Sequence, residues 1–294
     1  MKLLFIINPI AGKGKTKDAI PIIYKFCNDR GILYEVKETH FPGNATDMVL
    51  DAVTHGYSAI VAVGGDGTVL EVANGLIGTS LPLGIIPLGA GNDFARALNI
   101  PIGFEHIVDS IKIITESVPI QVDIGKFTDR FFLNIASVGF DAEIIRDLHT
   151  VKRFIKGSAA YPLSVFLKFL TYKPKDVTLT IDGKTIKTKI FLAAICNGIC
   201  YGGGMLINPN GSVTDGYFDL ILVKPIARYK IPLLLSKFIK GLHLKLPYVV
   251  TYRCKEVEIL STEALAVNID GECASTIPIA FNMIPLSIHV YGAL

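Results

Sequence analysis

A glycine-rich turn around a single aspartate is the stretch of this sequence best suited to chemistry: Gly64-Gly65-Asp66-Gly67-Thr68. Glycine has no Cβ to block a polyanion, so backbone N–H groups in such a turn can point toward phosphate oxygens. Residues 59–63 predict a buried strand before the turn, and a helix beginning near Thr68 would add the positive end of its dipole. Because a carboxylate at the tip suits a phosphate that carries Mg²⁺, the turn predicts a metal–nucleotide site. Taken alone, it is equally typical of a tight strand-to-helix connection.

Two other turns have a related composition. The first, Asn8-Pro9-Ile10-Ala11-Gly12-Lys13-Gly14-Lys15, lies between a predicted strand at 2–7 and a predicted helix from about 16 to 29. It resembles a phosphate loop without the Walker A spacing, and a helix N-terminus with solvated lysines explains it as well. The second, Leu88-Gly89-Ala90-Gly91-Asn92-Asp93-Phe94-Ala95-Arg96, follows a predicted strand at 83–87 and enters another helix.

The elements that position these turns alternate between strand and helix up to about residue 118. A strand at 33–37 and a helix at 45–54 complete the series. This order is typical of an α/β domain, Rossmann-like and doubly wound, with a mainly parallel sheet and helices on both faces. Ligands of such folds bind beyond the carboxyl ends of the strands, so we expect the glycine-rich turns to converge on one cleft.

From about residue 120 the pattern changes to short alternating stretches, which predict antiparallel strands in a mostly β, sandwich-like second domain. The predicted strands are 177–181, 188–195, 217–223, 257–260, 266–269 and 287–291. We therefore expect a domain at 1–120 and a second at 121–294, with a tail at about 280–294 that can return to the first.

Two segments of the second domain, 151–170 and 225–242, are predicted to be helical. Both mix basic and apolar residues, as do helices that lie on anionic membranes. A helix packed on a sheet, with its lysines in solvent, has the same pattern, so the two explanations stay open.

Composition argues against several classes of function. The 294 residues carry a net charge of +3 without an aromatic-interleaved basic patch, which disfavours nucleic-acid binding. The five cysteines form no C-x-x-C pair and indicate reduced thiols rather than a disulfide framework. No secretory signal pattern opens the chain, and no apolar run approaches the roughly 18 residues that would span a bilayer. With 50% hydrophobic residues and a mean hydropathy of +0.47, we expect a cytoplasmic protein whose membrane contact is peripheral.

Further polar groups stand in the second half of the chain. Asn197-Gly198, 201–204 and 208–211 form a glycine-rich connection, and Asp215-Gly216 can hold a hard cation through carboxylate and carbonyl oxygens. Asp270-Gly271-Glu272 places two carboxylates just after a predicted strand, where they can supply a general base and a metal ligand. A polar hairpin turn is the commoner explanation of such a pair.

Taken together and in order, these motifs resemble the soluble bacterial diacylglycerol kinase family. That family is related to the catalytic domains of eukaryotic diacylglycerol, ceramide and sphingosine kinases. The resemblance covers nearly the whole chain. The motifs that carry it are Asn8-Pro9 with Gly12, Gly64 to Thr68 with Glu71 and Asn74-Gly75, Gly89 to Arg96, Asn197-Gly198, Tyr201 to Gly204, Asp215-Gly216 and Asp270-Gly271-Glu272.

The resemblance implies an ATP-dependent lipid kinase of phospholipid biosynthesis. It would transfer the γ-phosphate of Mg·ATP to the hydroxyl of diacylglycerol, giving phosphatidic acid, or to a related long-chain lipid alcohol. Its active site would lie in the cleft between the nucleotide domain and the lipid-substrate domain, and a homodimer is left open. Two alternatives are an NAD kinase, which shares the Gly-Gly-Asp-Gly-Thr turn, and a non-catalytic nucleotide- or lipid-binding protein of the same fold.

The same resemblance implies the site residues, position by position. Asp66 and Asp93 would lie near the metal–phosphate centre. Glu272 would be the proton acceptor, with Asp270 as metal ligand or alternative base. A second, structural Mg²⁺ would bind Asp215 and the backbone oxygens of Ser212 and Tyr217. The nucleotide would contact Asn8, Pro9, Ile10, Ala11, Gly12, Thr39, Gly65, Asp66, Gly67, Thr68, Val69, Leu70, Glu71 and Ala90.

Two positions depart from the family pattern. Ala90 stands where many relatives have Thr or Ser, which leaves only the backbone amide for a phosphate contact. Thr214 stands where a second aspartate is common before Asp215-Gly216, which weakens the case for the structural metal.

Overall fold

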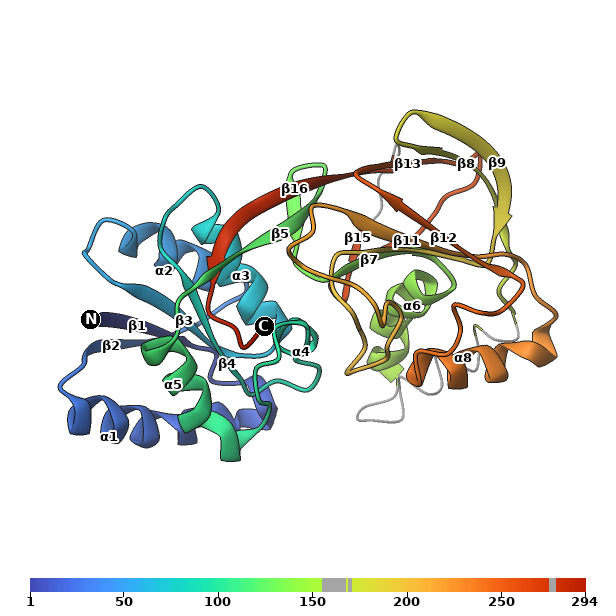
Figure 1. The fold of residues 1–294 in the computed structure, drawn as a ribbon. Helices are drawn as coiled ribbons and strands as arrows, with labels where there is room; N and C mark the ends of the chain where they lie inside the picture. Colours follow the sequence, from blue (N-terminus) through green and yellow to red (C-terminus); the bar gives the residue numbers. More distant parts are fainter. Residues whose placement is uncertain (155–167, 169–170, 275–278) are drawn as a thin grey trace. The chain divides into compact units, whose positions relative to one another are not determined.

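The computed structural model describes residues 1–154, 168, 171–274 and 279–294. These residues form two compact units (Figure 1). The first unit comprises Met1–Ile124, Val213–Asp215 and Ile284–Leu294, and the second comprises Gly125–Ser212 and Gly216–Met283. Two strands, β5 (Ile120–Phe127) and β16 (Ile279–Val290), run from one unit into the other.

The first unit is built on a parallel sheet in which the strands lie in the order β2-β1-β3-β4, with the end of β16 beside β4. The strands are β1 (Lys2–Ile7), β2 (Leu33–Glu38), β3 (Ala59–Gly64) and β4 (Leu83–Pro87). All residues of β3 and β4 are buried, which explains their continuous apolar sequences. The predicted parallel sheet is confirmed.

Helices cover both faces of this sheet (Figure 1). They are η1 (Ala11–Ala19), α1 (Ile20–Arg30), α2 (Asn44–Ala52), α3 (Asp66–Leu76), α4 (Asp93–Ala97), η2 (Phe104–His106) and α5 (Ile107–Glu116). On one face Phe26 of α1 and Ile111 of α5 share a buried cluster with Phe5 of β1. On the other face α2 and α3 pack closely, because a Cβ on Gly75 would lie only 2.7 Å from the Cβ of Val49.

The helix predicted from about residue 16 begins later than expected. Residues 11–19 form the 3-10 segment η1, which is interrupted by left-handed Gly12, Lys13 and Gly14, and α1 begins at Ile20. Pro21 explains the shift. In a helix begun at Thr16 its ring would clash with the carbonyl of the preceding turn, whereas the first turn of α1 accommodates it.

The second unit contains a six-stranded sheet, mostly antiparallel, in the order β12-β11-β10-β7-β14-β15. Its strands are β7 (Ile135–Gly139), β10 (Leu192–Cys196), β11 (Phe218–Val223), β12 (Val249–Cys254), β14 (Val267–Ile269) and β15 (Glu272–Ala274). A second layer holds the ends of β5 and β16 that belong to this unit, with β6 (Arg130–Phe132), β8 (Lys175–Ile181), β9 (Lys184–Ile190) and β13 (Glu256–Leu260).

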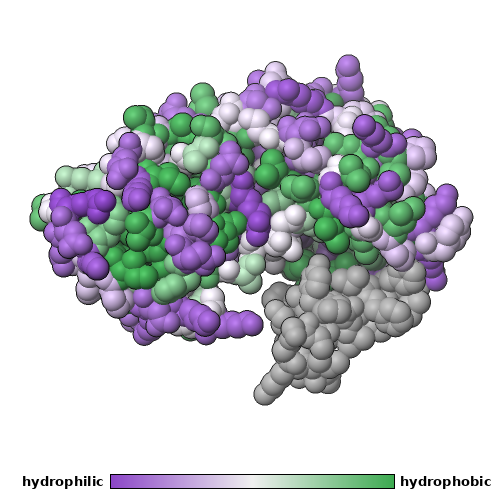
Figure 2. All heavy atoms as spheres, turned by 60° about the horizontal axis from the view of Figure 1, so that its bottom comes forward, coloured by the Kyte–Doolittle hydropathy of each residue, from purple (hydrophilic) through white to green (hydrophobic). Residues whose placement is uncertain are grey.

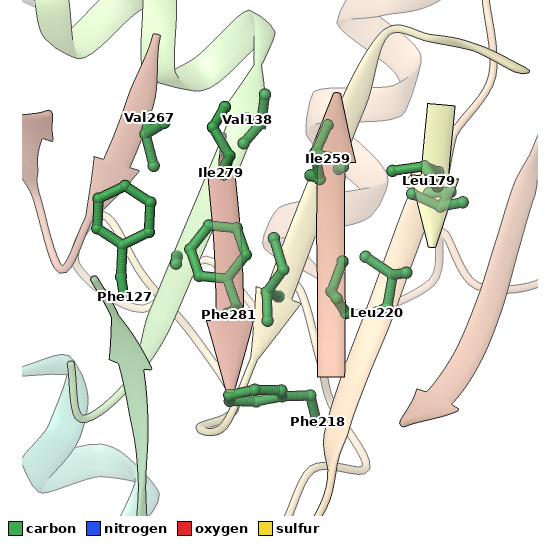
Figure 3. Packing of buried hydrophobic residues seen from close by; sticks show 14 of the residues in the cluster. Phe127, Val138, Leu179, Phe218, Leu220, Ile259, Val267, Ile279 and Phe281 are labelled. Atoms are coloured by element: carbon green, nitrogen blue, oxygen red, sulfur yellow. The ribbon is translucent and has the colours of Figure 1, made fainter. Parts of the chain in front are cut away.

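The core of this unit lies between the two layers (Figure 3). Val138 and Leu220 come from the six-stranded sheet, and Leu179, Ile259 and Phe281 from the second layer. The outer face of the six-stranded sheet is covered by α6 (Phe140–Phe154) and α8 (Ile231–Ile239), the latter preceded by η3 (Arg228–Lys230). The predicted sandwich-like domain is therefore confirmed as a fold class.

Two predictions of single strands need correction. The strand predicted at 188–195 is two strands, since the chain leaves β9 at Ile190, passes Phe191 and enters β10 in the other sheet. Both strands are buried where they meet, so their sequences run together. Residues 287–290 are the end of β16, which pairs in parallel with β4 in the first unit and is not an antiparallel strand of the second.

The two predicted helices of the second domain are only partly covered by the described residues. The segment 151–170 overlaps α6, which begins earlier, at Phe140, while 155–167 and 169–170 lie outside the described residues. The segment 225–242 contains η3 and α8, with Pro232 in the first turn of α8. In the part of the chain that the structure describes, no helix is both long and apolar enough to cross a membrane.

Candidate active site

The three glycine-rich turns of the first unit meet at the carboxyl ends of β1, β3 and β4. A Cβ on Gly89 would lie 2.2 Å from the Cα of Gly65, so the turns after β3 and β4 are in backbone contact. A Cβ on Gly12 would lie 2.5 Å from the carbonyl oxygen of Leu88, which brings the first turn to the same place. Since real Cβ atoms do not approach this closely, glycine is required at these positions. The predicted convergence of the turns is confirmed.

A hydrogen-bonded pair links the first two turns. The Asn8 side-chain amide donates to Thr68 Oγ1 at 3.1 Å, and Asn8 Oδ1 accepts the N–H of Ile10 at 3.2 Å. Thr68 is buried, and a Cβ on Gly64 would lie 2.6 Å from its hydroxyl oxygen. Asn8 and Thr68 therefore fix the turns to each other, whatever else they contact.

Asp66 stands at the centre of these turns and holds the start of α4. Its Oδ2 accepts the N–H of Asn92 and its Oδ1 the N–H of Asp93, both at 2.7 Å. The N–H of Phe94 is 3.3 Å from Oδ1. A carboxylate that accepts the first amides of a helix satisfies donors that would otherwise lack a partner. The turn after β3 thus sets the position of the turn after β4.

Asp66 and Asp93 form a pair of enclosed carboxylates under Gly91. A Cβ on Gly91 would lie 2.6 Å from Asp66 Oδ2 and 3.3 Å from Asp93 Oδ2, and Asp93 is only 7% exposed. Burial raises the pKa of Asp66 and the neighbouring charge of Asp93 raises it further, while the backbone donors oppose both effects. A cation bound here would relieve the repulsion between the two carboxylates.

The donor set suits Mg²⁺ bound together with a phosphate. Among residues 1–154, 168, 171–274 and 279–294, no three or more His, Cys, Asp or Glu side chains gather into a metal site. Mg²⁺ does not require such a group, because it usually takes one or two carboxylates and completes its shell with water and substrate phosphate. Asp66 and Asp93 meet that requirement.

The other predicted nucleotide residues occupy different places around the turns. Pro9 and Ile10 precede η1, Ala11 and Gly12 open it, and Ile10 is 81% exposed. The N–H of Thr39 donates to the Ile7 carbonyl at 2.9 Å, at the end of β2. Gly65 precedes α3, and Gly67, Val69 and Leu70 lie in it; Ala90 is exposed on the neighbouring turn.

Glu71 is the predicted nucleotide residue with the clearest structural task. Its Oε2 accepts the N–H of Ala45 at 3.1 Å, and its backbone carbonyl accepts the hydroxyl of Thr46 at 2.8 Å. These bonds cap the beginning of α2. Glu71 therefore ties α3 to α2 in this structure.

In the second unit, Asp270 is the first residue of the two-residue hairpin turn between β14 and β15, and Glu272 is the first residue after that turn, but the two side chains have different surroundings. Asp270 and Gly271 both have positive φ, as a type I′ turn requires. The Asp270 carboxylate accepts the N–H of Leu133 at 2.7 Å and that of Ile135 at 2.9 Å, with Asn134 at 3.2 Å. The Glu272 side chain is 67% exposed, and its nearest ionic partner is Arg130 at 3.8 Å.

The segment that Asp270 holds also contacts the predicted Asn197-Gly198 motif. Asn197 donates its N–H to the Asn134 carbonyl at 2.9 Å and its side-chain amide to the Leu133 carbonyl at 2.6 Å. A Cβ on Gly198 would lie 1.6 Å from Asn134 Oδ1, so only glycine fits there. The structure therefore joins these two motifs through residues 133–135.

Sequence reasoning passed over Asp141, which follows β7 at the start of α6. Its carboxylate accepts hydrogen bonds from the Ser137 hydroxyl and the Ala142 N–H, and Asn268 donates to the same Ser137 hydroxyl at 3.2 Å. Burial raises the pKa of Asp141, while the hydrogen bonds from Ser137, Ala142 and Tyr201 oppose the shift. Asp141 stands two residues after Gly139, the last residue of buried β7, as Asp66 stands two residues after Gly64, the last residue of β3, and this position is the signal that marks it.

The residues predicted for a second metal lie where the chain passes between the units. Asp215 belongs to the first unit, and Ser212 and Tyr217 belong to the second. Within the first unit, the fully buried Asp123 binds the same segment through its N–H, which donates to the Val213 carbonyl at 2.7 Å. Asp123 Oδ1 also accepts the N–H of Leu286 at 2.8 Å. Asp123 is a second residue that sequence reasoning missed.

Comparison with known proteins places these residues in a family. The model of the diacylglycerol kinase catalytic domain matches residues 2–127, and the model of the YegS C-terminal NAD kinase beta sandwich-like domain matches residues 134–292. A diacylglycerol kinase of Bacillus subtilis (strain 168) is 30% identical over 289 residues, which cover 97% of this chain and 94% of the relative. The chain belongs to the diacylglycerol kinase family.

Other members of the diacylglycerol kinase family agree along the whole length. One from Staphylococcus carnosus (strain TM300) is 30% identical over 97% of this chain and 93% of its own. The crystal structure of a diacylglycerol kinase from Bacillus anthracis str. Sterne matches with a TM-score of 0.73 and 25% identity, over 99% of this chain and 97% of that one. The resemblance drawn from the motifs is confirmed, and this member of the family is a lipid kinase.

Proposed function

We propose that this lipid kinase transfers the γ-phosphate of Mg·ATP to the hydroxyl of diacylglycerol, giving phosphatidic acid. The observation that carries the proposal is the pair Asp66 and Asp93, enclosed where three glycine-rich turns meet. Relatives named diacylglycerol kinase, 30% identical over nearly the whole chain, support diacylglycerol as the acceptor. A related long-chain lipid alcohol is the alternative acceptor, because apolar pockets discriminate weakly between acyl chains.

The nucleotide half of the reaction is assigned to the first unit. Backbone N–H groups around Gly65, Gly67 and Ala90 would face the phosphates, aided by the N-terminus of α3. Asn8 and Thr68 would contribute by holding the turns in place as well as by contact. Pro9 to Gly12 and Thr39, at the ends of β1 and β2, would line the remainder of the nucleotide site.

Asp66 and Asp93 would hold Mg²⁺, which supplies neutralisation of the charge that develops on the transferred phosphoryl group. Asp66 has a second task in this arrangement, since its carboxylate orients the first turn of α4. The positions of both carboxylates are therefore set by the fold before any ligand binds. Such preorganisation is the main way in which phosphoryl-transfer enzymes lower their barrier.

Glu272 is the better of the two candidates for the base that accepts the proton of the acceptor hydroxyl. A base needs a carboxylate oxygen that can reach the substrate, and the Glu272 side chain is 67% exposed. Asp270 is less suited, because both of its oxygens accept backbone N–H groups of residues 133–135. We assign Asp270 to positioning the turn that carries Glu272.

Two further parts of the proposal concern the environment of the enzyme. A structural Mg²⁺ is proposed at Asp215 with the backbone oxygens of Ser212 and Tyr217. Because diacylglycerol resides in the bilayer, we also propose that the protein works in the cytoplasm at the membrane surface, as a peripheral enzyme. A homodimer remains a prediction from the family resemblance.

Phosphoryl transfer to a panel of acceptors tests the proposed function. The purified protein would be given γ-labelled Mg·ATP with diacylglycerol, monoacylglycerol, ceramide or sphingosine in mixed micelles, and with NAD in buffer as a soluble control. We expect label in phosphatidic acid that requires Mg²⁺. Label in NAD alone, or in a sphingoid lipid alone, would contradict the assigned acceptor.

A further inference from the structure

A segment without acidic residues surrounds α8. Residues 220–255 contain no Asp or Glu in a chain whose net charge is only +3. The segment is therefore much more cationic than the protein as a whole. Its cations nearest to α8 are Lys224, Arg228, Lys230, Lys237, Lys240 and Lys245, all exposed except the half-buried Lys237.

α8 and its flanks also present apolar side chains to solvent. The residues of α8 that are buried against the sheet are Ile231, Leu234 and Phe238. The apolar residues that face outward are Tyr229, Leu233, Ile239 and Leu242, at 77%, 54%, 62% and 56% exposure. Figure 2 shows hydrophobic and hydrophilic side chains interspersed on the surface of the described residues. We call Tyr229, Leu233, Ile239 and Leu242 with Lys230, Lys237 and Lys240 the α8 surface.

The C-terminal end of this surface is held rigidly. Gly241 adopts a left-handed φ of +65° and ends the helix, and the N–H of Leu242 donates to the Lys237 carbonyl at 2.9 Å. The wholly buried His243 then bonds the Ile207 carbonyl through Nε2 at 2.8 Å and packs edge-on against Phe238. Leu242 is thus presented to solvent from a fixed backbone, so little order has to be gained on binding.

We infer that the α8 surface is where this protein docks on an anionic lipid bilayer. Apolar side chains among cations, on a segment that contains no acidic residue, match a surface of negative head groups above hydrocarbon. The inference rests on the proposed function, which requires the enzyme to reach a substrate held in the membrane. It adds to that function the surface of the protein that contacts the bilayer.

A second copy of the chain fits this surface less well. In a two-fold symmetric contact the same patch meets itself, so Lys230, Lys237 and Lys240 would face their own equivalents without an acidic residue of the segment to offset them. Anionic lipid offsets the cations and accepts the apolar side chains at the same time. An acidic protein partner would offset the charges as well, and the experiment below separates it from lipid.

The absence of tryptophan from the sequence makes a direct test possible. Leu233→Trp places a single tryptophan on the α8 surface, and Leu50→Trp places one at a similarly exposed leucine of α2, 58% exposed. We expect phosphatidylglycerol vesicles to shift the emission of the first variant to the blue and to leave the second unchanged. No shift at residue 233, or a shift with soluble polyglutamate but not with vesicles, would overturn the inference.

A second experiment removes positive charge from the α8 surface. Lys237→Gln with Lys240→Gln should weaken partitioning onto phosphatidylglycerol vesicles by about tenfold or more, with little effect on the weak binding to phosphatidylcholine. The matched control is Lys184→Gln with Lys187→Gln, two exposed lysines of β9. Equal sedimentation of the α8 variant, the β9 variant and the unaltered protein with anionic vesicles would contradict a docking role for α8.

A water-soluble substrate separates this inference from the proposed function. Short-chain diacylglycerol below its micelle concentration should be phosphorylated equally by the unaltered protein and the Lys237→Gln, Lys240→Gln variant. If neither phosphorylates diacylglycerol in any form but vesicle binding still depends on α8, the proposed acceptor is wrong and the docking surface stands. If both proteins phosphorylate diacylglycerol and the α8 substitutions do not change vesicle binding, the proposed acceptor stands and the docking surface is wrong.

Discussion

In the proposed reaction, Asp66 would combine a structural and a chemical task in one carboxylate. It holds the first amides of α4, and its pKa is raised by burial and by the neighbouring Asp93. The two residues differ in what their loss would do. Removing the Asp66 side chain leaves backbone donors without their acceptor, whereas Asp93→Asn removes negative charge with almost no change of shape.

Asp93→Asn should therefore affect metal dependence more than stability. We expect kcat for diacylglycerol to fall by about 10² or more, and half-maximal activity to need a higher Mg²⁺ concentration, because one ligand charge is lost. A magnesium titration of turnover measures both effects. Asp47→Asn, an exposed acid in the first turn of α2, is the control. An unchanged magnesium profile for Asp93→Asn would remove this residue from the metal site.

Asp141 allows a test of stability against pH. Burial raises the pKa of its carboxyl, so the native state binds the proton more tightly than the unfolded chain. The stabilisation is then present below the ordinary pKa near 3.8 and is lost as pH rises through the raised pKa.

For Asp141→Asn, which cannot ionise, we consequently predict a Tm at pH 7 about 2 to 4 °C above that of the unaltered protein. The difference should shrink toward pH 4. Thermal unfolding followed by circular dichroism at several pH values measures it, with the exposed Asp176→Asn as control. A lower Tm for Asp141→Asn at pH 7 would mean that its hydrogen bonds outweigh the cost of burial.

At the scale of the elements, two glycines of the converging turns differ in whether the surrounding atoms leave room for a side chain. Gly89 is confined by the backbone of Gly65, which cannot move aside, so Gly89→Ala must displace one turn. A Cβ on Gly67, in α3, would meet nothing within 4 Å.

We therefore expect Gly89→Ala to lower the Tm by several degrees and to weaken ATP binding, as a backbone clash should. Gly67→Ala should keep or slightly raise the Tm, because alanine is the better helix former. The same variant should bind ATP more weakly if a phosphate group lies close to residue 67. Thermal shift and ATP titration separate the two effects. Equal loss of Tm in both variants would contradict the packing described for the turns.

The elements also show what the sequence could predict. Strand–helix alternation and the glycine spacing predicted the parallel sheet and the meeting of its turns, because both depend on local pattern. Pattern did not reveal that residues 188–195 change sheets at Phe191, because Ile190, Phe191 and Leu192 are all buried and the apolar run continues across the junction. The task of Glu71 in capping α2 was likewise hidden, because its partner Ala45 is an ordinary backbone amide distant in sequence.

At the candidate site, the family resemblance named Asp66, Asp93, Asp270 and Glu272 and placed Glu272 ahead of Asp270 as the base. The sequence could not give the physical reason for that order, which lies in the contacts: Asp270 accepts backbone amides of residues 133–135, and Glu272 is exposed. Asp123 and Asp141 were missed because each is a single acid, the first within β5 and the second just after β7, without a glycine-rich motif of its own.

For the whole molecule, the burial of the thiols gives a simple test of the fold. Burial raises the pKa of Cys27 to about 11 and that of Cys254 to about 12, and Cys196 and Cys200 are buried as well. Because the thiolate is the reactive form, these groups should be inert in the native state.

Titration with a disulfide reagent at pH 8 should find at most one slowly reacting thiol, that of the half-buried Cys273, and five after unfolding. Cys273→Ser should abolish the native reaction. Two or more rapidly reacting thiols in the native protein would contradict the burial described for both units.

In the proposed function, the first unit supplies the groups for Mg·ATP, and Glu272 of the second unit would take the proton from the lipid hydroxyl. Single-turnover transfer of γ-labelled phosphate to diacylglycerol by Glu272→Gln, with Asp270→Asn alongside, tests this most directly. We predict that Glu272→Gln binds Mg·ATP and unfolds as the unaltered protein does but transfers phosphate about 10² to 10⁴ times more slowly. Asp270→Asn should mainly lose stability. Transfer at the unaltered rate by Glu272→Gln would contradict the account.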